Sequence, residues 1–97
     1  MNKLGPEWEI RYHPLVVKKD IPRLNKIDAK RVKSAIERKL TLNPVIYGIP
    51  LRGTLKQFWK LRVGDWRVIF TIKNKEVYIL VIANRKEVYE TAERRTC

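Results

Sequence analysis

The sequence has few of the residues that build metal sites and covalent cross-links. Of its 97 residues, one is His (His13) and one is Cys (Cys97), so neither a disulfide framework nor a zinc site can be assembled. The carboxylates are not clustered, which excludes a two-metal nuclease centre. A ribonuclease mechanism with two histidines is excluded by the same count. If the protein catalyses a reaction, Lys, Arg and Tyr side chains must carry it, and no cofactor is expected.

Long apolar runs are also missing. The longest unbroken run extends from Val77 to Ala83, far short of the roughly 20 residues that a membrane helix needs. The first residues show no apolar stretch followed by small side chains, so no secretory signal is visible. These absences predict a cytoplasmic protein that has no membrane partner.

Negative charge is scarce. The chain has 22 Lys and Arg against 10 Asp and Glu, which leaves a formal net charge of +12 with His neutral. The first part of the chain, up to Leu51, and the remainder each carry 11 basic and 5 acidic residues. Such a charge attracts polyanions, of which nucleic acid is the commonest. Because no charged arm exists, any anion site must be assembled by folding.

The first half of the chain predicts one strand and two helices within a single domain that spans residues 1–97. Alternating apolar residues over Glu7–Tyr12 predict the strand. Helical spacing predicts a helix over Leu15–Leu24, whose last turn Pro22 would damage. A second helix, capped by Asp28, carries its apolar stripe on the residues Val32, Ala35, Ile36 and Leu40. Val45–Arg52 is interpreted as a connecting loop.

The second half predicts an antiparallel sheet. Phe58–Val63, Trp66–Ile72 and Val77–Ala83 are rich in β-branched and aromatic residues, and hairpin-length connections join them. Residues from Arg85 onward form a short tail or helix. The order strand, helix, helix, three strands implies an α+β domain. Its curved antiparallel β-sheet has the two N-terminal helices packed on one face, and its other face uncovered.

Several cations are predicted to meet on the uncovered face. Alternation along the strand puts Phe58, Lys60 and Arg62 on one side, and the core residues Trp59, Leu61 and Val63 on the other. Arg67 and Arg85 lie near them in the predicted sheet. Like charges that converge repel each other, and a bound phosphate relieves that repulsion. The alternative is a set of solvated cations paired with acidic neighbours, namely Asp65, Glu87 and Glu90.

Three blocks of this sequence resemble the RelE/ParE toxin superfamily: Leu51-Arg52-Gly53, the run from Trp59 to Phe70, and the run from Asn84 to Tyr89. The resemblance covers nearly the whole chain. It implies a RelE-like fold and a toxin of a type II toxin–antitoxin system that a cognate RelB-like antitoxin neutralises. In the RelE branch the toxin enters the ribosomal A site and cleaves messenger RNA without a metal. The ParE branch poisons DNA gyrase and lacks the ribonuclease residues.

The resemblance also implies a set of catalytic residues: Lys60, Arg62, Arg67, Arg85 and Tyr89. A further lysine of the family, two residues before Lys60, is replaced here by Phe58. The implied reaction is attack of an RNA 2′-hydroxyl on the adjacent phosphorus, so DNA, which lacks that hydroxyl, should resist. Lys60 or Tyr89 would help to remove the hydroxyl proton. Arg67 and Arg85 would stabilise the negative phosphorane.

Other cations are expected to bind phosphates of ribosomal RNA and messenger RNA as positioning charges. They are Arg52, Lys56, Lys30, Arg31, Lys33, Arg38 and Lys86. A solvated helix face explains the helix cations equally well. Two other interpretations stay open. One is a gyrase inhibitor without nuclease activity, favoured if Phe58 marks a loss of catalysis. The other is a nucleic-acid-binding module with no catalytic role.

Overall fold

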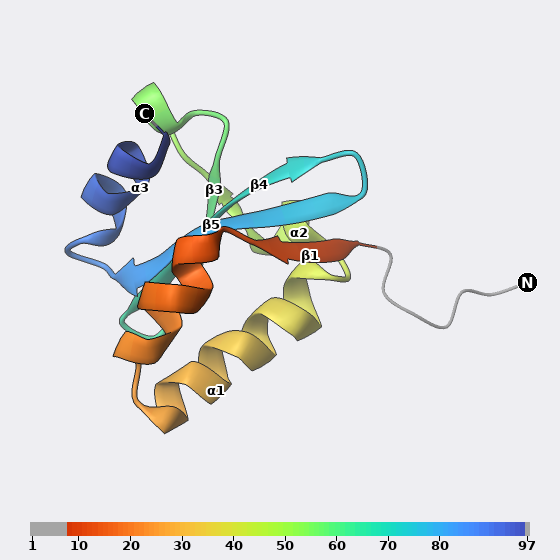
Figure 1. Cartoon of the computed structure of the whole chain (residues 1–97). Helices are drawn as coiled ribbons and strands as arrows, with labels where there is room; N and C mark the ends of the chain where they lie inside the picture. The colour runs from red at the N-terminus through yellow and green to blue at the C-terminus, as the bar shows by residue number, and fades with distance from the viewer. Residues whose placement is uncertain (1–7, 97) are drawn as a thin grey trace, which may run out of the picture.

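Five strands form one curved sheet (Figure 1). The computed structural model describes residues 8–96, so Cys97 and the expected strand start at Glu7 lie outside the described residues. The strands are β1 (Glu9–Tyr12), β2 (Ile49–Pro50), β3 (Trp59–Val63), β4 (Trp66–Lys73) and β5 (Glu76–Asn84), and their order is β1-β5-β4-β3-β2. The three strands predicted after Gly53 are confirmed as β3, β4 and β5.

The sheet is mixed and not antiparallel throughout. β3, β4 and β5 form the predicted antiparallel meander, but β1 pairs with β5 in parallel, with Ile10 opposite Val77. The reason is topological. The helical segments that follow β1 carry the chain to the far edge of the sheet at β2. The meander then returns strand by strand, so β5 runs alongside β1 in the same direction.

Two helical segments cover one face of the sheet, which confirms the predicted α+β arrangement. The first consists of the π-helical turn η1 (Val16–Asp20) and the short 3₁₀ helix η2 (Ile21–Arg23). The second consists of α1 (Lys26–Ala35), continued by the π-helical turn η3 (Ile36–Leu40). Their buried side chains pack with Phe70 and Ile79 of the sheet in the larger core cluster.

The cap expected at Asp28 is wrong, because the helix begins earlier. Asn25 is the N-cap residue, and its Oδ1 accepts the N–H of Asp28 at 2.7 Å. Asn and Asp are both good caps, but a helix has only one N-cap position. Asp28 instead lies in the first turn, where its carboxylate accepts a hydrogen bond from Trp66 Nε1 at 3.0 Å. This contact ties α1 to the start of β4.

The segment interpreted as a loop over Val45–Arg52 contains regular structure. α2 (Pro44–Tyr47) is a single helical turn, for which the Asn43 side chain accepts the N–H of Ile46 at 3.2 Å. Gly48 follows it and leads into β2. A Cβ atom at Gly48 would lie 2.6 Å from Phe70 Cζ, so only glycine lets the backbone approach the core this closely. A 3₁₀ turn, η4 (Gly53–Leu55), then leads to β3.

The second face of the sheet is not uncovered, which corrects the expectation. The predicted tail forms α3 (Val88–Thr96), and the side chains of Val88 and Ala92 pack against Ile69 and Val81 in a second, smaller core. Their i, i+4 spacing gives the helix an apolar stripe that is stable only against another apolar surface. None of the helices within residues 8–96 has the length and apolar character needed to cross a membrane.

A buried ion pair joins α3 to η1. The Arg95 guanidinium donates to both carboxylate oxygens of Asp20, at 2.7 and 2.8 Å, and also to the carbonyl oxygen of Leu80 at 2.9 Å. Asp20 further accepts the N–H of Ile82 at 2.9 Å. The Asp20 side chain is 2% exposed and that of Arg95 is 9% exposed. The pair therefore links η1 to α3 across β5.

We expect Arg95→Ala to lower the free energy of unfolding by about 3–5 kcal/mol, because the substitution leaves the Asp20 charge buried without its partner. Arg94→Ala is the matched control, since its side chain is 66% exposed and its ion pair with Glu90 lies on the surface. That control should cost less than about 0.5 kcal/mol. Urea unfolding of both variants measures the difference. Equal losses would contradict a structural role for the pair.

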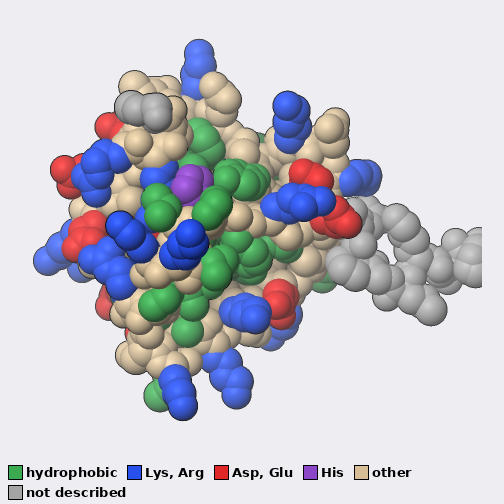
Figure 2. Space-filling model, viewed as in Figure 1, with side chains coloured by type: hydrophobic (Ala, Val, Ile, Leu, Met, Phe, Trp, Pro, Cys, Tyr) green, Lys and Arg blue, Asp and Glu red, His purple; other side chains and the backbone are tan. Residues whose placement is uncertain are grey.

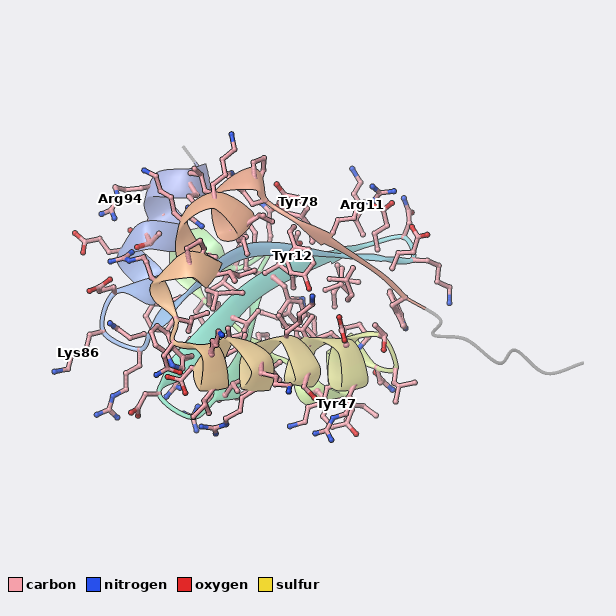
Figure 3. The ribbon with its side chains drawn as sticks, turned by 60° about the horizontal axis from the view of Figure 1, so that its bottom comes forward. Arg11, Tyr12, Tyr47, Tyr78, Lys86 and Arg94 are labelled. Atoms are coloured by element: carbon pink, nitrogen blue, oxygen red, sulfur yellow. The ribbon has the colours of Figure 1, made fainter. Side chains whose placement is uncertain are left out.

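A second prediction concerns Tyr12 of β1, which is partly buried and lines a hollow together with residues of α1 (Figure 3). Burial raises the pKa of its phenol above the ordinary value of 10.0, and the Glu37 carboxylate adds to the increase. The folded state therefore keeps the phenol proton at a pH where the unfolded chain loses it. This contribution to stability is complete below the unfolded pKa and is lost as pH rises through the folded pKa.

We expect the free energy of unfolding to fall more between about pH 8 and about pH 11 for the wild-type protein than for Tyr12→Phe. Chemical denaturation at both pH values measures the two decreases. The lysines titrate in both proteins, so the difference between them isolates the phenol. Equal decreases would show that Tyr12 is as accessible when folded as when unfolded.

Candidate functional site

The face of the sheet that carries α3 also carries the predicted strand cations. In the β3–β4 pair Lys60 lies opposite Ile69 and Arg62 lies opposite Arg67. Ile69 belongs to the second core, under α3. Because side chains alternate along a strand, Lys60, Arg62 and Arg67 share the face of Ile69.

Lys60 and Tyr89 are in direct contact. The Lys60 ammonium group donates to the Tyr89 phenolic oxygen at 3.0 Å and lies 5.6 Å from the centre of its ring. Tyr89 reaches this position because α3 begins at Val88, immediately after a tight turn. In that turn Asn84 Oδ1 accepts the N–H groups of Lys86 and Glu87, at 2.9 and 3.0 Å. The contact joins two residues that lie 29 positions apart in the sequence.

Arg67 is held by the backbone of the β3–β4 turn. Its Nη1 donates to the carbonyl oxygens of Gly64 and Trp66, at 2.8 and 3.0 Å. Gly64 adopts a positive φ of 61°, the left-handed conformation that glycine allows. The sequence predicted a hairpin-length connection between these two strands, but no role for Gly64 in positioning Arg67. The side chain of Arg62 is exposed across from Arg67.

Arg85 lies at the same end of the sheet. Its backbone N–H donates to the carbonyl oxygen of Asp65, at 3.0 Å, which places it against the turn that holds Arg67. Arg85 and Lys86 line a small hollow with Asp65, and both side chains are exposed. Figure 3 shows Lys86 projecting away from the body of the protein. The geometry thus gathers the predicted residues in two neighbouring sets, Lys60 with Tyr89 and the arginines around the turn.

A basic groove continues from this end of the sheet. Its volume is about 590 Å³, and it runs between α1–η3 and the end of β3. Four of its cations were among the predicted phosphate contacts or catalytic residues, and Lys39 is a fifth; they are Lys30, Arg31, Arg38, Lys39 and Arg62. Arg62 therefore faces both the groove and the predicted site. Lys33 does not line this groove and instead borders the apolar hollow around Tyr12.

Arg52 and Lys56 do not line this groove. They flank η4 on either side, and both are exposed. η4 is linked to α3 by a hydrogen bond from the Thr54 hydroxyl to Glu93, at 2.7 Å. Figure 2 shows further basic side chains over the face formed by η1, β1 and α1, so positive charge is not confined to the predicted site. Residues 8–96 contain no group of three or more His, Cys, Asp or Glu side chains that could hold a metal ion.

Phe58, which stands in place of the family lysine, has a packing role. Its ring is partly buried and contacts the second core, which includes Leu55 and Val88. An aromatic ring at this position adds apolar contact under α3, whereas a lysine would bring a charge to the site. The site therefore has Lys60 as its single strand lysine.

The family model described as ParE toxin of type II toxin-antitoxin system, parDE, matches residues 10–89. No curated protein sequence matches the chain. Among solved structures, the toxin–antitoxin complex RelBE2 from Mycobacterium tuberculosis is 24% identical, with a TM-score of 0.75 over 88% of this chain and 98% of that chain.

Two further structures share the fold. The archaeal RelE–RelB complex from Pyrococcus horikoshii is 25% identical, with a TM-score of 0.60 over 81% of this chain and 96% of that chain. Free RelE toxin from E. coli is 16% identical, with a TM-score of 0.64 over 94% of this chain and 99% of that chain. The family model spans most of the described sheet and both helical segments on its first face. The chain therefore belongs to the ParE toxin family of type II toxin–antitoxin systems, within the RelE/ParE superfamily.

Proposed function

We propose that this toxin is a ribosome-dependent endoribonuclease that cleaves messenger RNA in the A site and thereby inhibits translation. The observation that carries the proposal is the 3.0 Å contact between Lys60 Nζ and the Tyr89 oxygen. It lies on the same sheet face as the cross-strand pair Arg62 and Arg67. A proton-donating pair beside several cations, of which Arg67 is held by the backbone, is what phosphodiester cleavage by Lys, Arg and Tyr requires.

The cleavage itself uses the substrate's own nucleophile. The 2′-oxygen forms a bond to the adjacent phosphorus, the bond from phosphorus to the 5′-oxygen breaks, and a 2′,3′-cyclic phosphate and a 5′-hydroxyl result. One proton must leave the 2′-hydroxyl and one must reach the 5′-oxygen. In the observed contact the Lys60 ammonium donates to the phenolic oxygen, so the pair is placed to supply the proton that the 5′-oxygen needs. To accept the proton of the 2′-hydroxyl, the pair must first give one up.

The arginines act on the charge that develops at phosphorus. A guanidinium stays protonated at any working pH and offers parallel N–H groups to phosphate oxygens. Arg67 is preorganised by its bonds to Gly64 and Trp66. In the described chain, Arg62 and Arg85 have no side-chain ion pair or hydrogen bond, so their donors are free for a bound phosphate. Preorganised donors of this kind contribute strongly to the rate.

The ribosome supplies the rest of the substrate geometry in this proposal. The groove that contains Lys30, Arg31, Arg38 and Arg62 offers a track of cations for RNA phosphates, and Arg52, Lys56, Lys33 and Lys86 extend the basic surface. Contacts of this type position a nucleic acid without reading its sequence. Binding through them weakens as salt rises, because the RNA releases counterions when it binds.

A cognate antitoxin of the RelB class is the second proposed partner. The Mycobacterium tuberculosis and Pyrococcus horikoshii structures are themselves toxin–antitoxin complexes. A net charge of +12 favours rapid association with an acidic protein. The proposed site of action is the cytoplasm, where ribosomes and the antitoxin meet the toxin.

Gyrase inhibition without nuclease activity is the alternative function. Two observations favour it: the matching family model is that of ParE toxins, and Phe58 packs into the second core where the RelE pattern has a lysine. On this alternative, the contact between Lys60 and Tyr89 only fastens α3 to the sheet. Cut messages at the A site would support the ribonuclease, and intact messages with a DNA damage response would support the gyrase inhibitor.

We expect Arg67→Ala to lower the rate of cleavage of ribosome-bound message by about 10²- to 10³-fold, because it removes a preorganised donor to the developing phosphorane. Lys18→Ala is the matched control. It removes the same charge from an exposed position on η1, which covers the opposite face of the sheet from α3. Single-turnover cleavage on a gel gives both rates. Equal rates for the two variants would remove Arg67 from the mechanism.

We expect Tyr89→Phe to lower the same rate by about 10²-fold or more, because the phenolic oxygen can no longer exchange a proton with Lys60. The ring and its packing are kept, so the free energy of unfolding should change little. A wild-type cleavage rate in this variant would assign Tyr89 to packing alone.

A further inference from the structure

Exposed apolar side chains cluster on one short segment of the chain. Eight large hydrophobic residues are exposed among the described residues, and five of them fall within residues 42–49. These five form the 42–49 ridge, made of Leu42, Val45, Ile46, Tyr47 and Ile49. Scattered exposed apolar residues are ordinary, but a contiguous group bordered by charge marks an interaction surface.

The ridge is a fixed feature of the fold. Pro44 is buried, and Gly48 approaches Phe70 so closely that a Cβ atom there would clash with its ring. These two residues hold both ends of α2 against the core. With Pro44 turned inward, the other three positions of the helical turn must point outward. The apolar side chains are therefore presented to solvent by a backbone that has little freedom to withdraw them.

The surroundings of the ridge are basic. Residues 38–64 contain six Lys and Arg and no Asp or Glu. Lys39 lies with its ammonium group 5.7 Å from the centre of the Tyr47 ring, and Ile49 pairs with Lys60 of β3. Figure 3 shows Tyr47 at the surface near the end of the long helical segment that contains α1. An apolar strip with a positive rim complements a segment that has apolar side chains and negative flanks.

The edge of the sheet at β2 favours a helical occupant. β2 is the last strand of the sheet, so one of its edges is free. It is only two residues long, and Pro50 has no N–H to donate. A short edge that contains proline is a poor template for an added strand. Side chains, and not main-chain pairing, must then supply the contact, as when an amphipathic helix lies on an apolar strip.

We propose that the 42–49 ridge is the docking surface for an acidic amphipathic helix of the cognate antitoxin. This inference rests on the proposed antitoxin partner, but not on the proposed ribonuclease activity. A second copy of this chain is a poorer occupant, because each copy carries +12 and brings the same basic rim to the contact. The ridge reaches the predicted site at one end only, where Ile49 lies opposite Lys60, and the tested residue, Ile46, belongs to α2 and not to the sheet.

The test compares Ile46→Glu with Ile27→Glu in binding to the purified cognate antitoxin. The two isoleucines are 73% and 72% exposed, and both substitutions lower the net charge equally. Ile27 lies on α1, outside the ridge. Isothermal titration calorimetry should show at least about a tenfold loss of affinity for Ile46→Glu, the scale of one buried isoleucine. Ile27→Glu should bind within about twofold of the wild-type protein.

Three results would overturn the proposal. They are equal affinities of the two variants, no binding of the wild-type toxin to the antitoxin, and a dimer of the free toxin that Ile46→Glu dissociates. Cleavage of ribosome-bound message by the free toxin is measured separately. It should be the same in the wild-type protein and Ile46→Glu. The wild-type toxin could fail to cleave message while its affinity for the antitoxin still depends on Ile46. That result would refute the proposed ribonuclease activity but support the proposed docking surface.

Discussion

The buried pair of Asp20 and Arg95 is the interaction on which the arrangement of the second sheet face depends. It joins η1, on the first face, to α3, on the second, and both partners also bond to the backbone of β5. A buried charge pair of this kind contributes less to net stability than to the choice of one arrangement, because either charge left alone in the interior is costly. Without the pair, α3 would be held mainly by Val88, Ala92 and surface contacts.

The geometry of the candidate site depends on the position of α3 on the second face of the sheet. The strands set Lys60, Arg62 and Arg67 on one face at fixed spacing, and that part of the site needs no helix. Tyr89, in contrast, is carried by the first turn of α3, so its contact with Lys60 exists only while α3 lies on the sheet. One part of the site, Lys60 with Arg62 and Arg67, is thus built into the β3–β4 pair. The other part, Tyr89, depends on how α3 is held on the sheet, and the Asp20–Arg95 pair holds the C-terminal end of that helix.

The sequence predicted the elements that have a strong local residue pattern and missed the features that depend on a distant contact. Runs of β-branched and aromatic residues joined by hairpin-length connections located β3, β4 and β5, and the resemblance pointed to the residues that meet around the β3–β4 turn. The parallel pairing of β1 could not be read locally, since it depends on where the meander ends. The sequence contains part of the signal that α3 packs on the second face. Val88, Ala92 and Arg95 share one helix stripe, and a cation in such a stripe indicates a buried partner. The partner, Asp20, lies 75 residues away, so no local pattern identifies it.

The most direct test of the account is a double-mutant cycle between Arg95→Met and Tyr89→Phe, with the cleavage rate of ribosome-bound message as the readout and folding of each variant verified by circular dichroism. If the Asp20–Arg95 pair positions Tyr89, loss of the phenol should slow the wild-type toxin by about 10²-fold or more and the Arg95→Met variant by only a fewfold. Additive effects of the two substitutions would contradict the account, because the ion pair and the phenol would then act independently.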